Sequence, residues 1–251
     1  MPKELKRYAR HVVLKKIGVA GQKKLLASSV LLIGAGGLGT PAAMYLAAMG
    51  VGRIGIADGD DIELSNLQRQ VMYGMSDVGE GKARTAAAFL RNMNPDVTPE
   101  LHETYIDKGN IGGIIAGYDF ILDCTDNFAS KFLINDACVG AGKPFVFAGI
   151  GSFYGQIMTC VPGQSACCRC VFGGEDTDGE LPEDRRGGVI GALCGVMGSL
   201  QAMEAIKYLA GIGELLTDRL LTYDALTAEF SAHGTVRRRD CGVCGAAPAL
   251  K

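Results

Sequence analysis

The sequence predicts an α/β fold: a Rossmann-like, doubly wound and mostly parallel sheet, with C-terminal antiparallel strands and a zinc-tied C-terminal tail. Three observations support this prediction. Short apolar runs alternate with helical patterns through residue 150, the first run ends in a glycine-rich loop at residues 34–39, and two Cys-x-x-Cys pairs lie in the second half of the chain. Such alternation is typical of βαβ units, in which helices join parallel strands.

Each element follows from the local pattern of apolar residues. Continuous apolar runs next to glycine or polar residues indicate buried strands, and apolar residues at intervals of three and four indicate helices. Residues 162–188 are polar and rich in glycine, which predicts a long loop that is either a binding loop or a disordered segment. We expect helices over 4–26, 39–49, 80–93, 128–141 and 190–210, and strands over 30–33, 53–57, 97–102, 118–122, 144–148, 153–161, 219–223 and 227–232.

Composition narrows the class of protein. The chain has 251 residues, of which 48% are hydrophobic, and this is enough for one domain with a large core. A formal net charge of −2 gives no reason to expect a nucleic acid or a membrane as partner. The N-terminus lacks the apolar core of a signal peptide, so we expect a cytoplasmic protein. The most apolar long segment contains Gln201, Glu204 and Lys207, which indicates a buried helix.

The glycine-rich loop has the spacing G-x-G-x-x-G, formed by Gly34, Gly36 and Gly39, with Gly37 as a further glycine. Glycines permit a tight turn and let backbone N–H groups approach a phosphate, and the helix that follows favours an anion at its N-terminus. Asp58 lies 24 residues after Gly34, at the end of the second expected strand, where an acidic side chain binds ribose hydroxyls. A chance glycine-rich turn is the alternative, and the placement of strand, helix and acid argues against it.

The glycine loop alone does not distinguish NAD from ATP. A triphosphate needs cations around its β- and γ-phosphates and a carboxylate for Mg²⁺. Asn66, Arg69, Lys82 and Asp126 each lie in a loop or at a helix start after a strand, and ligands of open α/β sheets bind at those carboxyl ends. Each residue alone is readily explained as a surface charge or a helix cap, but their joint placement favours ATP.

With these residues the sequence resembles the MoeB/ThiF family, the prokaryotic relatives of ubiquitin-activating enzymes. The matching segments follow one another in order along nearly the whole chain, and their combination is far more specific than the glycine loop. They are Arg7-Tyr8-Ala9-Arg10, the loop 34–39, Asp58-Gly59-Asp60, Ser65-Asn66-Leu67-Gln68-Arg69-Gln70, Gly81-Lys82, Asp123-Cys124-Thr125-Asp126-Asn127, Cys167-x-x-Cys170, residues 198–207 and Cys241-x-x-Cys244.

The resemblance implies an adenylyltransferase. ATP would adenylylate the C-terminal glycine carboxylate of a small ubiquitin-like sulfur-carrier protein that ends in Gly-Gly, and pyrophosphate would be released. The carrier would be ThiS-like or MoaD-like and would serve thiamine or molybdopterin cofactor synthesis. The sequence leaves the choice between the two pathways open.

The resemblance also implies which residues form the site. Asp58 would bind the ribose, and Asp126 would hold Mg²⁺. Arg10 would reach the triphosphate bound by the neighbouring subunit, which implies a homodimer with shared sites. The residues assigned to catalysis are Arg69, Lys82, Asp126 and Arg10. The nucleotide site comprises Gly34, Gly36, Gly37, Gly39, Asp58, Asp60, Asn66, Arg69, Gln70, Lys82, Asp126 and Asn127.

The residue types suit this chemistry. A C-terminal carboxylate is ionised near neutral pH, so it attacks the α-phosphorus without a general base. The enzyme must position the reactants and neutralise the charge that develops on the departing pyrophosphate. Three alternatives are weighed: adenylation of a small-molecule carboxylate, an NAD-dependent oxidoreductase, and a silent scaffold that binds a carrier without chemistry. The cationic and acidic residues after the strands disfavour the last two.

The paired cysteines predict a metal site. Cys167 and Cys170 form one Cys-x-x-Cys knuckle and Cys241 and Cys244 the other, and Cys241 comes 71 positions after Cys170. Two such knuckles suit tetrahedral Zn²⁺, and four protein ligands leave no open catalytic position, so we expect a structural zinc. Unrelated thiol pairs or a redox pair are the alternatives. Cys168 is left out because its place inside the knuckle makes it a poorer ligand.

Other cysteines are expected to be inert. Cys124, Cys138, Cys160 and Cys194 have apolar neighbours, which indicates buried thiols. Many members of the resembled family carry a transfer cysteine in the long loop, where this chain has Asp184. This departure predicts a protein that stops at the acyl-adenylate and leaves sulfur delivery to another protein, with a cysteine desulfurase as a candidate partner.

We expect one domain of three parts. They are a helical arm over residues 1–28, a nucleotide-binding core over 29–150, and a region over 151–251 that contains the carrier-binding strands, a crossover loop, the long helix and the zinc tail.

Overall fold

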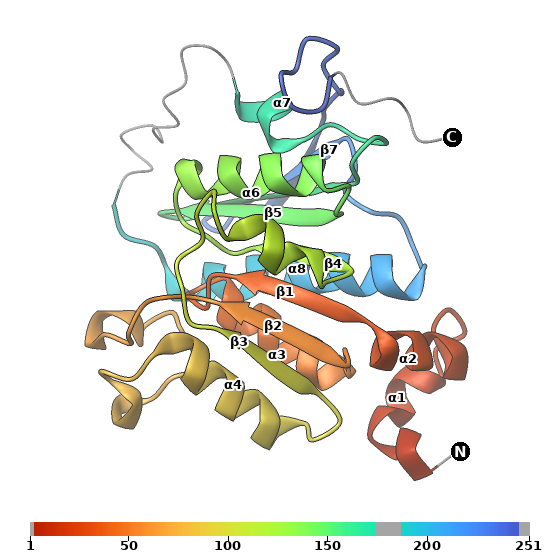
Figure 1. Cartoon of the computed structure of the whole chain (residues 1–251), viewed down its shortest axis with the longest axis vertical. Coiled ribbons are helices and arrows are strands. Elements are labelled where there is room, and N and C mark those ends of the chain that lie inside the picture. The colour runs from red at the N-terminus through yellow and green to blue at the C-terminus, as the bar shows by residue number, and fades with distance from the viewer. Residues whose placement is uncertain (1–2, 174–186, 246–251) are drawn as a thin grey trace.

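Eight strands form one sheet in the computed structural model, which describes residues 3–173 and 187–245. Their order is β3-β2-β1-β4-β5-β6-β7-β8 (Figure 1). Strands β1 to β5 are parallel, and β6, β7 and β8 are added antiparallel, which confirms the predicted fold class. The strands are β1 (Ser29–Ile33), β2 (Arg53–Ala57), β3 (Thr98–His102), β4 (Phe120–Asp123), β5 (Phe145–Gly151), β6 (Tyr154–Cys160), β7 (Arg219–Asp224) and β8 (Glu229–Gly234).

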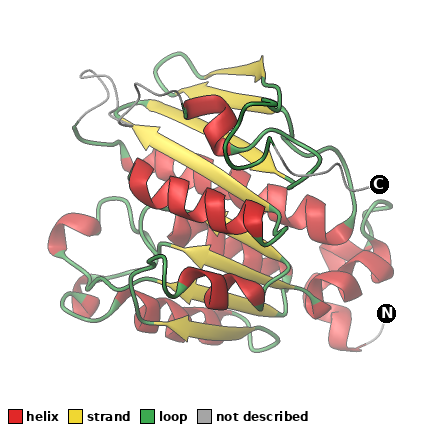
Figure 2. Cartoon of the chain, turned by 45° about the horizontal axis from the view of Figure 1, so that its top comes forward, coloured by secondary structure: helices red, strands yellow, loops and turns green. Residues whose placement is uncertain are grey.

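The parallel part of the sheet is buried on both faces, as the continuous apolar runs predict. In β1, Val30 and Leu32 belong to one core cluster, and Leu31 and Ile33 belong to another on the opposite face. Figure 2 shows helices on both sides of the strands. The sheet is therefore doubly wound.

The helices divide between the two core clusters. Helices α3 (Gly39–Met49), α4 (Lys82–Met93) and α8 (Gly191–Ala210) contribute to the first cluster, and α5 (Ile111–Ala116) and α6 (Phe128–Gly140) to the second. Among the described helices, none has both the length and the apolarity needed to cross a membrane.

The N-terminal segment differs from the single helix predicted over residues 4–26. It consists of a 3-10 helix (Lys3–Tyr8), α1 (Ala9–Val12), turns, and α2 (Gly18–Ala27). Gly18 has a φ of +57°, a left-handed conformation that a continuous right-handed helix does not contain. Of the apolar residues that predicted this helix, Leu5, Tyr8 and Ile17 are buried but Val13 is 69% exposed, and the spacing missed the break.

Two short helices were also missed. Helix α5 contains Gly112 and Gly113, which weaken the helical signal. Helix α7 (Cys168–Phe172) lies inside the predicted long loop, where the first cysteine knuckle folds into a helical turn. The helix expected from residue 80 begins at Lys82. Glu80 lies in the preceding loop, and Gly81 is the N-cap with an extended backbone.

Candidate active site and metal centre

A cleft of about 1270 Å³ opens at the carboxyl ends of the parallel strands. Strand order reverses between β1 and β4, and such a switch point is where open α/β sheets bind ligands. The structure brings nearly all of the predicted nucleotide-site residues into this cleft. They are Gly34, Gly36, Gly37, Asp58, Asp60, Asn66, Arg69, Gln70, Lys82, Asp126 and Asn127.

The glycine loop turns sharply from β1 into α3. Gly34 has a φ of +100°, and a Cβ there would lie 2.8 Å from the carbonyl oxygen of Cys124. A Cβ at Gly39 would overlap the carbonyl oxygen of Gly34. Gly39 does not line the main cleft, and its effect is to let the loop close. Side chains are thus excluded at the two ends of the loop, which leaves its backbone exposed to the cleft.

Asp58 follows β2 and is fixed by backbone hydrogen bonds. Its carboxylate accepts one from the N–H of Ala35, at 2.7 Å, and one from the N–H of Asp60, at 2.8 Å. Burial raises the pKa of Asp58, while these two hydrogen bonds oppose the rise. The side chain therefore joins the glycine loop to the end of β2, at the place expected for ribose binding.

Lys82 begins α4 and forms an ion pair with Asp60, with 2.7 Å between Nζ and Oδ2. The backbone N–H of Lys82 also donates to the carbonyl oxygen of Asp60, at 2.9 Å. The lysine side chain is only 9% exposed. The hydrogen bond from Lys82 is the main reason that the pKa of Asp60 lies below its ordinary value. Lys82 is thus a desolvated cation at the edge of the cleft.

A short 3-10 turn (Leu64–Asn66) positions the next polar group. The side-chain oxygen of Asn66 accepts from the backbone N–H of Glu63, and Nη1 of Arg69 donates to the carbonyl oxygen of Ser65 at 3.1 Å. Gln70 is 3% exposed, and its Oε1 has no hydrogen-bond partner among the described residues. These contacts hold Arg69 in the wall of the cleft beside the glycine loop, where a Cβ at Gly37 would lie 3.5 Å from Cδ of Arg69.

The loop after β4 places Asp126 and Asn127 in the cleft. Both are exposed, and Asn127 caps α6 by accepting a hydrogen bond from the N–H of Ser130 at 2.8 Å. Capping explains this asparagine without a ligand, and its amide nitrogen also donates to Oδ1 of Asp126 at 3.4 Å.

Sequence reasoning missed a buried ion pair below this loop. Lys131 lies 3.3 Å from Asp123, and it donates to the carbonyl oxygen of Ala148 at 2.6 Å. Lys131 also lines the cleft. Its position one helical turn after Asn127 was the available signal, because residues four apart lie on the same face of a helix.

Tyr105 was missed as well. It lines the cleft from the loop after β3, three residues beyond the end of that strand. The rule that ligands bind beyond the carboxyl ends of parallel strands applies to this loop too, and it was the signal that could have found Tyr105.

Arg10 lies outside the cleft formed by the described residues. It is an exposed residue of α1. Figure 1 places α1 beyond the amino ends of the strands, whereas the cleft opens at their carboxyl ends. Within one chain Arg10 therefore does not contribute to the site.

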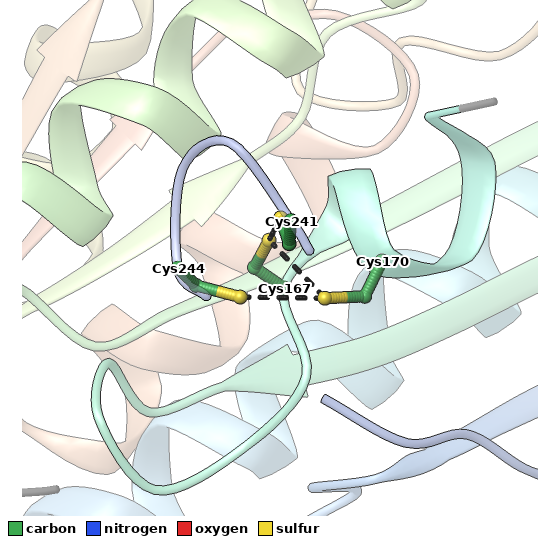
Figure 3. Close-up of side chains that lie close together, drawn as sticks. All are labelled: Cys167, Cys170, Cys241 and Cys244. Carbon is green, nitrogen blue, oxygen red and sulfur yellow. Dashed lines mark hydrogen bonds between the residues drawn. The ribbon is translucent and has the colours of Figure 1, made fainter. Parts of the chain in front are cut away.

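The four predicted metal ligands converge. Cys167, Cys170, Cys241 and Cys244 have sulfur atoms that all lie within 4.8 Å of one another. Figure 3 shows them coming from the start of α7 and from the C-terminal turn. The Sγ–Sγ distance is 3.9 Å between Cys167 and Cys170, and 3.8 Å between Cys167 and Cys241. Cys170 and Cys244 lie 3.3 Å apart.

These distances suit a zinc ion. Tetrahedral zinc with Zn–S bonds of about 2.3 Å requires sulfur atoms about 3.8 Å apart. Burial favours the neutral thiol of Cys241, but hydrogen bonds from the backbone N–H groups of Cys244 and Val243 outweigh it and lower the pKa of Cys241 to about 7. The N–H of Arg238 donates to the sulfur of Cys170 at 3.4 Å. These hydrogen bonds thus favour the thiolate of Cys241, the form that binds metal, whereas burial raises the pKa of Cys167 and of Cys244.

The other cysteines are buried, as expected. Cys124, Cys138, Cys160 and Cys194 are all free thiols, and burial raises the pKa of each. Cys168 is also buried and does not belong to the four-sulfur cluster. Asp184, which occupies the expected place of a transfer cysteine, lies outside the described residues.

Comparison with known proteins matches residues 8–244 to the ThiF family. The SAMP-activating enzyme E1 of Haloferax volcanii is 46% identical over 242 residues, which cover 96% of this chain and 89% of that protein. The sulfur carrier protein adenylyltransferase of Thermus thermophilus is 43% identical over 250 residues, covering 98% of this chain and 92% of that protein.

A solved structure supports the same grouping. The crystal structure of E. coli MccB with ATP has a TM-score of 0.80 and 25% sequence identity, and the match covers 90% of this chain and 70% of that chain. The family match spans almost all of the chain, and the relative from Thermus thermophilus is named an adenylyltransferase. The chain therefore belongs to the ThiF family, and it is an adenylyltransferase.

Proposed function

We propose that this protein uses ATP to adenylylate the C-terminal glycine carboxylate of a small ubiquitin-like sulfur-carrier protein, with release of pyrophosphate. The observation that carries the proposal is the joint placement of Asp58, Arg69, Lys82 and Asp126 around the glycine loop in one cleft. The names of the two curated relatives, a SAMP-activating enzyme and a sulfur carrier protein adenylyltransferase, support a carrier protein as the substrate.

The reaction is a substitution at the α-phosphorus. A carboxylate oxygen of the carrier forms a bond to that phosphorus, and the bond from phosphorus to the bridging oxygen breaks. The electron pair leaves with pyrophosphate, and no proton is transferred, because the carboxylate is already ionised. Positioning and charge neutralisation are then the tasks of the protein.

The residues divide these tasks. Asp58 binds the ribose, and backbone N–H groups of the glycine loop face the phosphates. Arg69 and Lys82 offset the charge of the leaving pyrophosphate, and Asn66 offers a polar contact beside them. Asp126 holds Mg²⁺, which when bound adds positive charge at the phosphates.

The remaining parts of the proposal concern assembly. Zinc at the four cysteines ties the C-terminal turn to α7 and has a structural role. The protein is a homodimer in which Arg10 enters the site of the neighbouring subunit. Sulfur comes from another protein, with a cysteine desulfurase as the candidate class.

A carboxylate on a small molecule is the second candidate substrate. The similarity to E. coli MccB, a structure whose title names ATP, supports ATP as the nucleotide but leaves the acyl substrate open. Comparing exchange with a ThiS-like carrier, a MoaD-like carrier and free small carboxylates distinguishes these substrates and also the thiamine and molybdopterin pathways.

The test is carrier-dependent exchange of labelled pyrophosphate into ATP by the Asp126→Ala variant. We expect exchange to fall to background, because Mg²⁺ loses its carboxylate ligand at the phosphates. Exchange at the wild-type rate in Asp126→Ala would refute the assignment.

The matched control is Glu214→Ala. Glu214 is an exposed acid in the connection after α8 and does not line the cleft. The same loss of one carboxylate there is expected to leave exchange unchanged. A similar loss in both variants would indicate a general effect of charge or stability.

A further inference from the structure

Asp60 uses both of its carboxylate oxygens. Oδ2 accepts from Nζ of Lys82 at 2.7 Å, and Oδ1 accepts from the hydroxyl of Tyr105, also at 2.7 Å. Tyr105, Asp60 and Lys82 thus form a chain of two short hydrogen bonds along the rim of the cleft. Both bonds involve a charged group, which makes them stronger than bonds between neutral groups.

The loop that carries Tyr105 is itself anchored. The carbonyl oxygen of Tyr105 accepts a hydrogen bond from the side-chain amide of Asn110 at 2.8 Å. Its ring packs on Gly59, where a Cβ would lie 2.9 Å from both the ring and the backbone nitrogen of Tyr105. The hydroxyl is therefore held in place by its backbone and by its ring, although the residue is 66% exposed.

A carboxylate with one oxygen bound to lysine still rotates about its terminal torsion, which has a broad energy profile. A second hydrogen bond to the other oxygen restricts that rotation. Asp60 lies in the loop after β2 with its side chain 47% exposed, so little else among the described contacts restrains it. The orientation of the lysine ammonium depends on this restraint.

We propose that Tyr105 is a positioning residue that acts through Asp60 to set the position of Lys82. The proposal rests on the proposed function in one respect, namely that Lys82 contacts the β- and γ-phosphates of ATP. Tyr105 does not touch the reacting atoms. Its hydroxyl fixes Asp60, and Asp60 directs the ammonium group toward the phosphates.

The test compares the affinities of Tyr105→Phe for Mg-ATP and for AMP by calorimetry. The substitution keeps the ring on Gly59 and removes only the hydroxyl. We expect ATP affinity to fall about two- to fivefold, in the range for partly exposed charged contacts, and AMP affinity to stay unchanged because AMP lacks the β- and γ-phosphates. Equal losses for both nucleotides, or no loss, would overturn the proposal.

A double-mutant cycle gives a second readout. In an Asp60→Ala background, Tyr105→Phe is expected to have no further effect on the ratio of ATP to AMP affinity, because the side chain that connects Tyr105 to Lys82 is already absent. Additive effects would overturn the proposal. The control is Tyr45→Phe, the same change on an exposed tyrosine of α3 that does not line the cleft.

These affinities are independent of any carrier protein. Absence of pyrophosphate exchange in the wild type would refute the proposed function and leave the affinity ratio measurable. Exchange in the wild type together with an unchanged ratio in Tyr105→Phe would refute only the role of Tyr105.

Discussion

Individual glycines in this protein differ in whether the surrounding atoms leave room for a side chain. At Gly39 a Cβ would overlap a backbone oxygen inside the glycine loop. At Gly140, in the last turn of α6, a Cβ would meet no described atom within 4 Å. Only the first glycine is required by packing, and the two provide a matched pair for mutation.

We expect Gly39→Ala to lower the free energy of unfolding by about 1–3 kcal/mol, because the loop must shift to admit the methyl group. ATP binding is expected to weaken with it, since the backbone donors of the loop move. Gly140→Ala is expected to be neutral or to stabilise by up to about 1 kcal/mol, because alanine favours the helix. Urea denaturation of both variants measures the difference, and equal stabilities would contradict the role of Gly39.

At the scale of elements, α6 connects the cleft to the cysteine cluster. Its N-terminal cap, Asn127, lines the cleft. Two turns further along, the side chain of Asn135 accepts a hydrogen bond from the N–H of Cys168 at 2.8 Å, and Asp136 pairs with Arg169 at 2.7 Å. The helix therefore holds α7, and with it the first cysteine knuckle, in a fixed relation to the cleft.

Loss of one zinc ligand tests the metal centre. We expect Cys170→Ser to lose bound zinc and to lower the melting temperature by about 5 °C or more, because metal binding contributes directly to folding. Elemental analysis and thermal unfolding measure both effects.

Cys168→Ser is the matched control, with the same substitution in a neighbouring residue outside the four-sulfur cluster. About one zinc per chain is expected to remain in it. Zinc loss in this control, or full zinc content in Cys170→Ser, would show that the four-cysteine assignment is wrong.

At the scale of the whole molecule, the two ends of the parallel strands face different parts of the protein. The cleft opens at the carboxyl ends, and α1 with Arg10 lies beyond the amino ends (Figure 1). A single chain with this arrangement cannot supply Arg10 to its own site. The proposed dimer resolves this separation because a neighbouring subunit brings its α1 to the cleft.

Mixing two inactive variants tests the shared site. Arg10→Ala and Asp126→Ala are each expected to lack exchange activity. After subunit exchange in an equimolar mixture, about a quarter of the wild-type activity should return, because half of the dimers are mixed and each has one complete site. Absence of recovery, despite mixed dimers observed by native mass spectrometry, would exclude a role for Arg10 in trans.

Sequence patterns predicted the parallel core well because both faces of its strands are buried. A continuous apolar run such as Val30–Ile33 is best explained as a central strand. The glycine loop directly follows this run, Asp58 directly follows the next strand, and Lys82 begins the next α-helix along the chain. The N-terminal helix was predicted too long, because apolar spacing continues across Gly18 while its backbone conformation does not.

The sequence by itself determined the fold class, the glycine turn at residues 34–39 and the four cysteines that converge in the structure. The local spacing of residues specifies each of these features, because it defines the strands, the glycine turn and the cysteine knuckles. Tertiary structure alone decided the pairing of Tyr105 with Asp60, the buried contact of Lys131 with Asp123, and the separation of Arg10 from the cleft. The fold brings the residues of the first two pairs together and keeps Arg10 away from the cleft. The local spacing of residues in the sequence does not specify which side chains become partners.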